Sequence, residues 1–277
     1  MTSYMPSMPD RELIGFIQHV KAQTGLSFDE SKRYLFESRL GPLLTEFNLS
    51  CYGELLRSVS SNTEGRENQA LISAITTNET YFFRDEHPFE LLKFKLIPDL
   101  LGKQRNANVM IGSAACSTGQ EAYSIAMVLK EILFDLTKFK VQIKGFDISD
   151  DAIVTASMGH YSNFEVQRGL SSDKIHRYFD VANGRYQIKP ELRSIVTFCR
   201  YNLLNPKKAL GKFDIIFCRN VVNYFGKQER ILLFNNLAEL LVQGGVLVIG
   251  ATELLSNDTN RFEKQRAFES VYYKKVI

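Results

Sequence analysis

The sequence predicts an α/β protein in which a helical N-terminal unit precedes a doubly wound, parallel sheet. From residue 108 onward, apolar strand-like runs alternate with helical segments, which is typical of a sheet with helices on both faces. Between residues 10 and 75 apolar residues recur at helical spacing, without an alternating strand-like run. Residues 161–195 are too long for a simple connection and hold a strand-like piece at 185–188, so we expect a small inserted antiparallel subdomain.

The N-terminal unit is expected to be a small helical bundle. Phe36, Leu40, Leu43, Leu44 and Phe47 fall at i, i+4, i+7, i+8 and i+11, the spacing of one helical face. Loops between its helices are predicted at residue 25 and at residues 48–50 and 58–66. A short segment ending at residues 82–84 then leads into a helix predicted from about residue 88 to residue 101.

The predicted sheet has six strands, which lie at residues 109–112, 141–147, 196–202, 213–218, 245–250 and 270–275. Helices are predicted between most of them, notably at residues 118–134 and 227–241.

The distribution of charge also divides the chain into two parts. Residues 1–85 hold 8 Lys and Arg against 11 Asp and Glu, a balance of −3, which leaves +6 for the remainder of a chain with net charge +3. This asymmetry favours two units.

Composition points to a globular, cytoplasmic protein. Of 277 residues, 44% are hydrophobic and 23% are charged, which permits a sizeable core. No run approaches the roughly 20 apolar residues that span a bilayer, and residues 1–10 lack a signal-peptide pattern, so no membrane insertion is expected. The four cysteines form no CxxC or CxxH pair, so no metal site is expected. A net charge of +3 is too small to indicate a nucleic-acid partner.

The stretch GSAACSTGQEAYS, residues 112–124, joins a predicted strand to a predicted helix through small residues. It is not a P-loop, because Gly119 is followed by Gln120, and the next lysine after Gly119 is Lys130. It also lacks the three-glycine spacing of a dinucleotide fingerprint. Small residues let a ligand approach the backbone and the helix N-terminus, yet a tight turn without a ligand explains this stretch equally well when it is considered alone.

Two further strand ends favour a ligand site. Asp147 ends the second predicted strand, where a carboxylate can accept hydrogen bonds from ribose hydroxyls. Arg219 and Asn220 directly follow the apolar run at residues 213–218. Ligands bind at the carboxyl ends of such strands, so we expect the three ends to share one site.

Eight sequence blocks, in order, resemble the CheR-type chemotaxis receptor glutamate methyltransferases, and together they cover nearly the whole chain. The blocks are TNETYFFRD (77–85), SAACSTGQEAYSIAM (113–127), FDIS (146–149), EVQRGL (165–170), YNLL (201–204), FDIIFCRNVVNYF (213–225), GGVLVIGATE (244–253) and FESVYYKK (268–275). No block is decisive alone, but the ordered set is specific.

The resemblance implies a helical domain at residues 1–76, a linker at 77–88 that contributes to the cofactor site, and a Rossmann-like S-adenosylmethionine-binding methyltransferase domain at 89–277. It places the inserted β-subdomain at about 162–196. The implied cofactor is S-adenosylmethionine, with S-adenosylhomocysteine as product and no metal. The implied cofactor contacts are Asn78, Thr80, Arg84, Glu121, Asp147, Asn202, Leu203, Arg219 and Asn220.

The chain departs from the family pattern at four positions. Gln120 and Ala122 stand where the family commonly has Glu and Pro, Gly112 where it has Trp, and Asn223 where it has an aliphatic residue. Because Glu121 is retained, we expect these changes to tune affinity or substrate preference and not to abolish binding.

The implied reaction is methyl transfer to a glutamate carboxylate, which gives a methyl ester. A glutamate with an ordinary pKa of about 4.3 is already ionised at neutral pH, so no general base is required. The chain must instead align the reacting atoms and exclude water. Arg84 and Tyr224 are the expected catalytic residues: Arg84 can orient the carboxylate, and Tyr224 can hydrogen-bond it or flank the sulfonium.

The implied partner is the cytoplasmic coiled coil of a methyl-accepting chemoreceptor, bound through charge on the N-terminal domain. Lys32, Arg33 and Arg39 are the candidate substrate-binding residues, and a solvated helix face is an equally open interpretation of them. The tip of the insertion, residues 180–189, has only Gly184 where members that bind a receptor tail pentapeptide have a glycine-rich loop. We therefore expect recognition that does not depend on the tail.

Two alternatives stay open. One is a methyltransferase for another substrate, although the Asn/Asp-Pro-Pro motif that holds a flipped base is absent from the sequence. The other is a non-catalytic module that senses S-adenosylmethionine or S-adenosylhomocysteine. The protein is expected to be a monomer.

Overall fold

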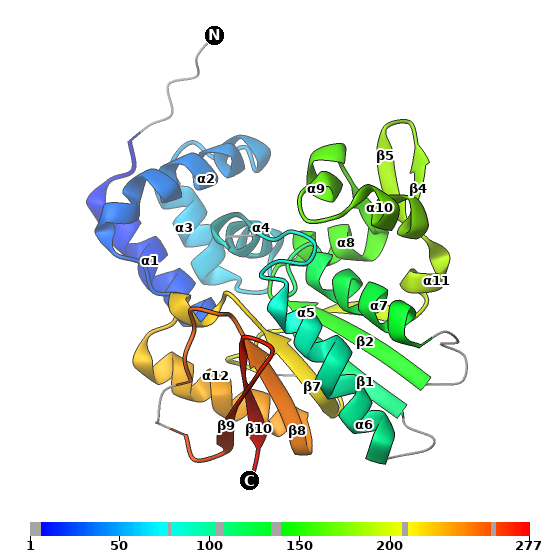
Figure 1. The fold of residues 1–277 in the computed structure, drawn as a ribbon. Helices are drawn as coiled ribbons and strands as arrows, with labels where there is room; N and C mark the ends of the chain where they lie inside the picture. Colours follow the sequence, from blue (N-terminus) through cyan, green and yellow to red (C-terminus); the bar gives the residue numbers. More distant parts are fainter. Residues whose placement is uncertain (1–6, 77–78, 104–107, 134–139, 207–209, 256–258) are drawn as a thin grey trace.

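The computed structural model describes residues 7–76, 79–103, 108–133, 140–206, 210–255 and 259–277. The N-terminal helices α1 (Asp10–Thr24), α2 (Arg33–Glu46), α3 (Tyr52–Ser61) and α4 (Arg66–Ile75) form the bundle at the upper left of Figure 1, with a short 3₁₀ turn, η1 (Glu30–Lys32), before α2. Helix α1 ends at Gly25, whose φ of 76° ends the helix in the left-handed conformation.

A second helical stretch connects the bundle to the sheet. It consists of α5 (His87–Leu91), the π-helical turn η2 (Leu92–Leu96) and α6 (Ile97–Lys103). Pro88 occupies the first turn of α5, where the missing N–H costs no helical hydrogen bond. The predicted single helix is therefore present, but it contains a π turn.

The main sheet has seven strands in the order β6-β2-β1-β7-β8-β10-β9. Its first five strands in that order are parallel, whereas β10 runs antiparallel to both neighbours. The strand bounds are β1 (Asn108–Ala114), β2 (Lys140–Asp147), β6 (Val196–Arg200), β7 (Phe213–Cys218), β8 (Leu241–Ile249), β9 (Phe262–Ala267) and β10 (Ser270–Lys275). The doubly wound prediction is confirmed, but the sheet is mixed, and strand β9 was not predicted.

Helices cover both faces of this sheet because consecutive strand residues point to opposite sides. On one face, Ile111, Ile215 and Phe217 pack with α5, η2 and α7 (Gln120–Ile132). On the other face, Phe213 and Ile216 pack with α12 (Lys227–Leu240) and with apolar residues of the N-terminal bundle. The bundle therefore shares a core with the sheet.

The expected inserted subdomain lies between α8 (Asp150–Met158) and β6, at the upper right of Figure 1. Its antiparallel sheet has the order β3-β5-β4, from β3 (His160–Tyr161), β4 (Phe179–Ala182) and β5 (Arg185–Ile188). The turn between β4 and β5 consists of Asn183 and Gly184, both with positive φ. Three short helices complete the insertion: α9 (Asn163–Gln167), α10 (Ser172–Tyr178) and α11 (Pro190–Arg193).

The loop after α1 joins the N-terminal bundle to the sheet domain. Leu26 forms a β-bridge with Phe225, and the Ser27 N–H donates to the Tyr224 carbonyl at 3.2 Å. The side chain of Asn202 also donates to the carbonyl of Gln23 at 2.8 Å. These contacts bring residues of the bundle to the carboxyl edge of the sheet. Within the described ranges, no helix is both long enough and apolar enough to cross a bilayer.

Candidate active site

The carboxyl ends of β1, β2 and β7 face a cavity of about 1100 Å³, part of which is open to solvent. Predicted site residues lie around it: Thr80, Arg84, Glu121, Asp147, Asn202, Leu203, Arg219, Asn220 and Tyr224. The sequence did not predict that Thr24, Leu26 and Phe28 of the N-terminal bundle also line the cavity. Asn78 falls outside the described residues.

The turn after β1 places its backbone along the cavity. Ala115, Ser117 and Gly119 have φ of 53°, 50° and 95°, so three residues of one short turn are left-handed. A Cβ at Gly119 would lie 2.9 Å from the Cβ of Ala156, so glycine is required for close packing as well as for backbone conformation. Cys116 lies in the same turn, and burial raises the pKa of its thiol well above the ordinary value. This thiol is therefore protonated at neutral pH.

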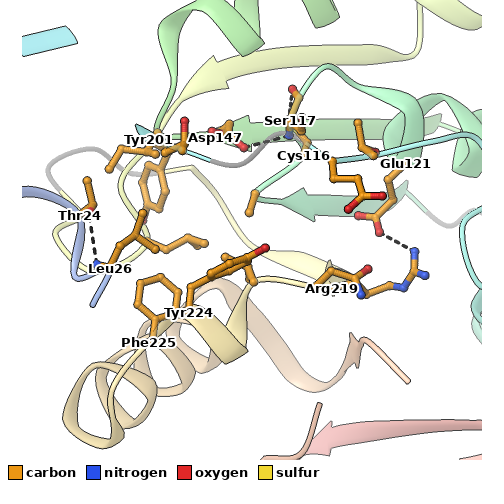
Figure 2. Close-up of a pocket in the computed structure, with 18 of the residues that line it drawn as sticks. Thr24, Leu26, Cys116, Ser117, Glu121, Asp147, Tyr201, Arg219, Tyr224 and Phe225 are labelled. Atoms are coloured by element: carbon orange, nitrogen blue, oxygen red, sulfur yellow. Dashed lines mark hydrogen bonds and ion pairs between the residues drawn. The ribbon is translucent and has the colours of Figure 1, made fainter. Parts of the chain in front are cut away.

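Asp147 lies at the end of β2 and is 7% exposed. Its carboxylate accepts the Ser117 and Ser149 N–H groups, each at 2.9 Å, and Figure 2 shows the bond to Ser117. Burial raises the pKa of Asp147, while its backbone hydrogen bonds act in the opposite direction. Each carboxylate oxygen retains capacity for another donor such as a hydroxyl.

Glu121 and Arg219 form an ion pair across the cavity wall, and Figure 2 shows the two side chains pointing toward each other. The Arg219 Nη1 to Glu121 Oε2 distance is 2.9 Å, and the Ser113 hydroxyl donates to the other Glu121 oxygen at 2.7 Å. Arg219 Nη2 also donates to the Arg84 carbonyl and to Asp85. Its buried Nε lacks a hydrogen-bond partner among the described residues.

The linker that carries Arg84 is held in an unusual backbone conformation. Phe83 and Asp85, on either side of Arg84, have φ of 53° and 64°. The Phe83 N–H donates to the Ser124 hydroxyl at 3.0 Å, and Arg84 Nη1 donates to the Glu79 carbonyl at 2.6 Å. Left-handed conformations of bulky residues persist only where the surroundings enforce them, so this segment is fixed in place by tertiary contacts.

Asn202 lines the cavity, but its amide is largely engaged elsewhere. Its Oδ1 accepts the N–H groups of Leu204 and Asn205 at 2.9 and 3.3 Å, while its Nδ2 donates to Gln23. Only one amide N–H is left beyond these bonds. The cofactor contact expected of Asn202 and the adjacent Leu203 therefore stays a prediction.

Glu253 was not predicted as a site residue, although it organises the loop after β7. This carboxylate is 2% exposed and accepts the N–H groups of Asn220, Val222 and Gly250 at 2.8, 2.7 and 2.8 Å. Asn220 has a left-handed φ of 59°, and the loop continues into η3 (Val222–Tyr224). Glu253 therefore fixes the backbone that presents Tyr224, whose side chain is 44% exposed, to the cavity.

The three basic residues predicted to bind substrate do not line the cavity. Arg39 donates from Nη1 to the carbonyls of Ala74, Ile75 and Thr76 at 3.0–3.1 Å and thereby caps the end of α4. Arg33 pairs with Asp10. Lys32 is exposed. Two of the three thus have structural partners, and their role in substrate binding stays a prediction.

The departures at residues 112 and 120 have local explanations. A Cβ at Gly112 would lie 3.2–3.3 Å from Phe146, Ile216 and Phe213, so the site cannot accept a large side chain without repacking. Gln120 is buried, and its Oε1 accepts the Thr118 hydroxyl at 2.8 Å.

The cavity residues fit S-adenosylmethionine by their chemistry. A buried carboxylate with spare acceptor capacity, Asp147, suits a ribose diol. Glu121 in the same cavity suits an ammonium group, and the unsatisfied buried Nε of Arg219 indicates a missing acceptor. Apolar residues such as Leu26 and Ile148 supply walls for a base.

Comparison with known proteins agrees with this fit. A model of the S-adenosylmethionine-binding domain of CheR methyltransferases matches residues 78–271, and a model of their all-α domain matches residues 11–76. Chemotaxis protein methyltransferase 1 of Vibrio cholerae is 38% identical over 271 residues, covering 97% of this chain and 98% of its own. The chemotaxis protein methyltransferase Cher2 of Pseudomonas putida is 36% identical over 254 residues, covering 90% of this chain and 92% of its own.

The fold and the site together define a methyltransferase that depends on S-adenosylmethionine. The chain belongs to the CheR methyltransferase family, and its activity is methylation in chemotaxis.

Proposed function

We propose that this protein transfers the methyl group of S-adenosylmethionine to glutamate side chains in the cytoplasmic coiled coil of bacterial chemoreceptors. The observation that carries the proposal is the position of Arg84 and Tyr224 in the wall of the same cavity as Asp147 and Glu121. A cation and a phenol beside the cofactor residues suit an acceptor that is already an anion. The relatives are named chemotaxis protein methyltransferases, which supports a chemoreceptor as the substrate.

In this proposal, residues 77–88 belong to the cofactor site. Asp147 binds the ribose, Glu121 takes the ammonium group, and the Arg219 guanidinium fixes Glu121 and the linker backbone. When bound, S-adenosylmethionine supplies an electrophilic methyl group on a sulfonium. Thr80, Asn202, Leu203 and Asn220 complete the walls around it.

Arg84 and Tyr224 act on the acceptor. Arg84 orients the glutamate carboxylate, and Tyr224 donates a hydrogen bond from its hydroxyl or covers the reaction centre with its ring. The apolar loop at Leu26 and Phe28 excludes water from the carboxylate, which raises its reactivity. No proton is removed, because the glutamate is ionised at neutral pH.

The acceptor glutamate belongs to the receptor, which binds this protein as a separate molecule. One copy of this protein suffices for the chemistry, so we expect a monomer. Lys32, in η1 directly before α2, is the remaining basic candidate for receptor contact. Arg33 and Arg39, the other two candidates, would first have to release their bonds to Asp10 and to the end of α4. The tight Asn183–Gly184 turn supports recognition that is independent of a receptor tail. The site of action is the cytoplasm, at receptor arrays.

The test uses S-adenosylmethionine labelled on its methyl group, mixed with this protein and soluble coiled-coil fragments of candidate chemoreceptors. Alkali-labile volatile methanol reports carboxyl methyl esters. We expect labelled methanol that disappears when the acceptor glutamates of the fragment are replaced by alanine. Cofactor binding by calorimetry without any transfer to any receptor fragment would instead support the sensor alternative.

A further inference from the structure

The inserted subdomain touches the linker that carries Arg84. Gly169, which follows α9, has a φ of 98°. A Cβ at this position would lie 1.9 Å from the carbonyl oxygen of Phe82 and 3.4 Å from the Tyr81 ring. The two backbones are therefore in direct contact, and only glycine permits this approach.

Arg168 uses that contact to reach two linker side chains. Its Nη2 lies 3.0 Å from Glu79 Oε1, and its guanidinium carbon lies 4.4 Å from the centre of the Tyr81 ring. The Arg84 guanidinium lies 5.7 Å from the centre of the same ring. Arg84 also donates to the backbone carbonyl of Glu79. Glu79 and Tyr81 thus connect Arg168 to Arg84.

This cluster differs from an ordinary surface ion pair in its charges and in its geometry. The side chains of Arg168 and Glu79 are 43% and 61% exposed, and a pair at such exposure contributes little by itself. Glu79, however, binds both guanidinium groups that lie near the Tyr81 ring: its carboxylate pairs with Arg168, and its backbone carbonyl accepts from Arg84. A planar guanidinium can stack on that ring while it binds the carboxylate, which a lysine ammonium cannot reproduce.

We propose that Arg168 is a positioning residue for Arg84: it fixes Glu79 and Tyr81, and these orient the guanidinium that holds the acceptor carboxylate. The inference rests on the proposed function of Arg84. The contacts of Arg168 act on the linker from the solvent side, whereas the buried Arg219 binds the Arg84 carbonyl from inside the protein. The strained residues on either side of Arg84 are thereby restrained from both sides.

The experiment compares Arg168→Met, Arg168→Lys and Glu79→Gln with the parent enzyme at saturating S-adenosylmethionine. Arg185→Met, which removes an exposed charge from the same subdomain, is the matched control. We expect Arg168→Met to lower kcat about tenfold, because small misplacements of a positioned group reduce rates strongly. Arg168→Lys should be intermediate. The dissociation constant for the cofactor and the melting temperature should change little.

Two results distinguish positioning from a general structural effect. In an Arg84→Ala background, Arg168→Met should cause no further loss of kcat, because it acts through Arg84. Amide exchange at residues 79–86 should quicken about fivefold in Arg168→Met without any receptor present. Unchanged kcat, a fully additive loss with Arg84→Ala, or unchanged exchange would each overturn the inference. A parent enzyme that methylates no receptor would overturn the proposed function, while the exchange result would still decide whether Arg168 orders the linker.

Discussion

Arg219 and Glu121 form an ion pair of 2.9 Å in which the arginine side chain is only 2% exposed. The pair joins the end of β7 to the first turn of α7, and the same guanidinium reaches the linker at Arg84 and Asp85. One buried cation therefore ties together three segments of the cofactor cavity. Because of this arrangement, substitutions of Arg219 or Glu121 should change the free energy of unfolding as well as the affinity for the cofactor.

Arg219→Met should lower the free energy of unfolding by about 3 kcal/mol, because it leaves Glu121 unpaired in a site that is 13% exposed. The double variant Arg219→Met with Glu121→Gln should regain part of that loss, since the uncompensated charge is gone. Urea unfolding measures both. If the double variant were as unstable as the sum of the single variants, the pair would not be energetically coupled.

The affinity for S-adenosylmethionine should depend on the pKa of Asp147, which burial raises. Only the carboxylate accepts two bonds from a diol, so affinity should fall as the pH drops through this raised pKa, earlier than for an ordinary aspartate. Asp147→Asn should bind about tenfold to hundredfold more weakly at neutral pH and show no such decline. Calorimetry across acidic pH tests this, with exposed Asp151→Asn as control.

Protonation of Asp147 should have opposite effects on stability and on binding: it stabilises the ligand-free fold and weakens cofactor affinity. A folded-state pKa above the unfolded value means that the charged Asp147 destabilises the ligand-free fold above that pKa. Protonation at lower pH removes this penalty. A ligand-free protein in which the Asp147 contribution favoured folding most at neutral pH would contradict the assignment of burial as the main cause.

Glu253→Gln should loosen the loop that presents Tyr224. An amide in place of the carboxylate brings an NH₂ group toward backbone N–H donors, so we expect a loss of about 2 kcal/mol in stability and a lower kcat. Exposed Glu263→Gln on strand β9 is the control. Chemical denaturation and initial rates are the measurements, and equal behaviour of the two variants would refute the positioning role of Glu253.

Arg39 and Lys32 should behave differently although they share one helical segment. Arg39→Ala removes three hydrogen bonds to the end of α4 and should cost about 1–2 kcal/mol of stability. Lys32→Ala should leave stability unchanged and raise KM for the receptor fragment if Lys32 contacts it. A raised KM for Arg39→Ala with full stability would favour a direct receptor contact instead.

Tyr224→Phe should lower kcat about tenfold while cofactor affinity stays within twofold of the parent, because the hydroxyl is proposed to act on the acceptor. Single-turnover rates with a receptor fragment test this without interference from product release. Parent-like single-turnover rates would leave Tyr224 only the role of a cavity wall.

Much of the fold was predictable because its signals are local. The strands at residues 213–218 and 270–275 have the predicted bounds, since each has a centre of residues that favour strands, Ile215-Ile216-Phe217 in the first and Val271-Tyr272-Tyr273 in the second. Strand β9, with the sequence FEKQRA, was missed because it is a polar edge strand. Its turn to β10 uses Phe268 and Glu269 with φ of 47° and 58°, without the glycine or asparagine that normally indicates such a turn.

The candidate site was predictable where residues follow strand ends, as Asp147 and Arg219 do. Glu253 could not be found in this way, because the two partners that connect it to the site lie 33 and 31 residues away, at Asn220 and Val222. Likewise, nothing in the local sequence indicated that Arg39 would cap α4. Long-range hydrogen bonds assign such polar residues their roles, and those bonds depend on the packing of the domains.

The most direct test of glutamate methylation is tandem mass spectrometry of a receptor fragment after incubation with this protein and S-adenosylmethionine. We expect one methyl group on specific glutamates of the coiled coil, which is lost after mild alkali and is strongly reduced with Arg84→Ala. Methyl groups on lysine, arginine or a small molecule, or none on the receptor while the cofactor is bound, would contradict the account.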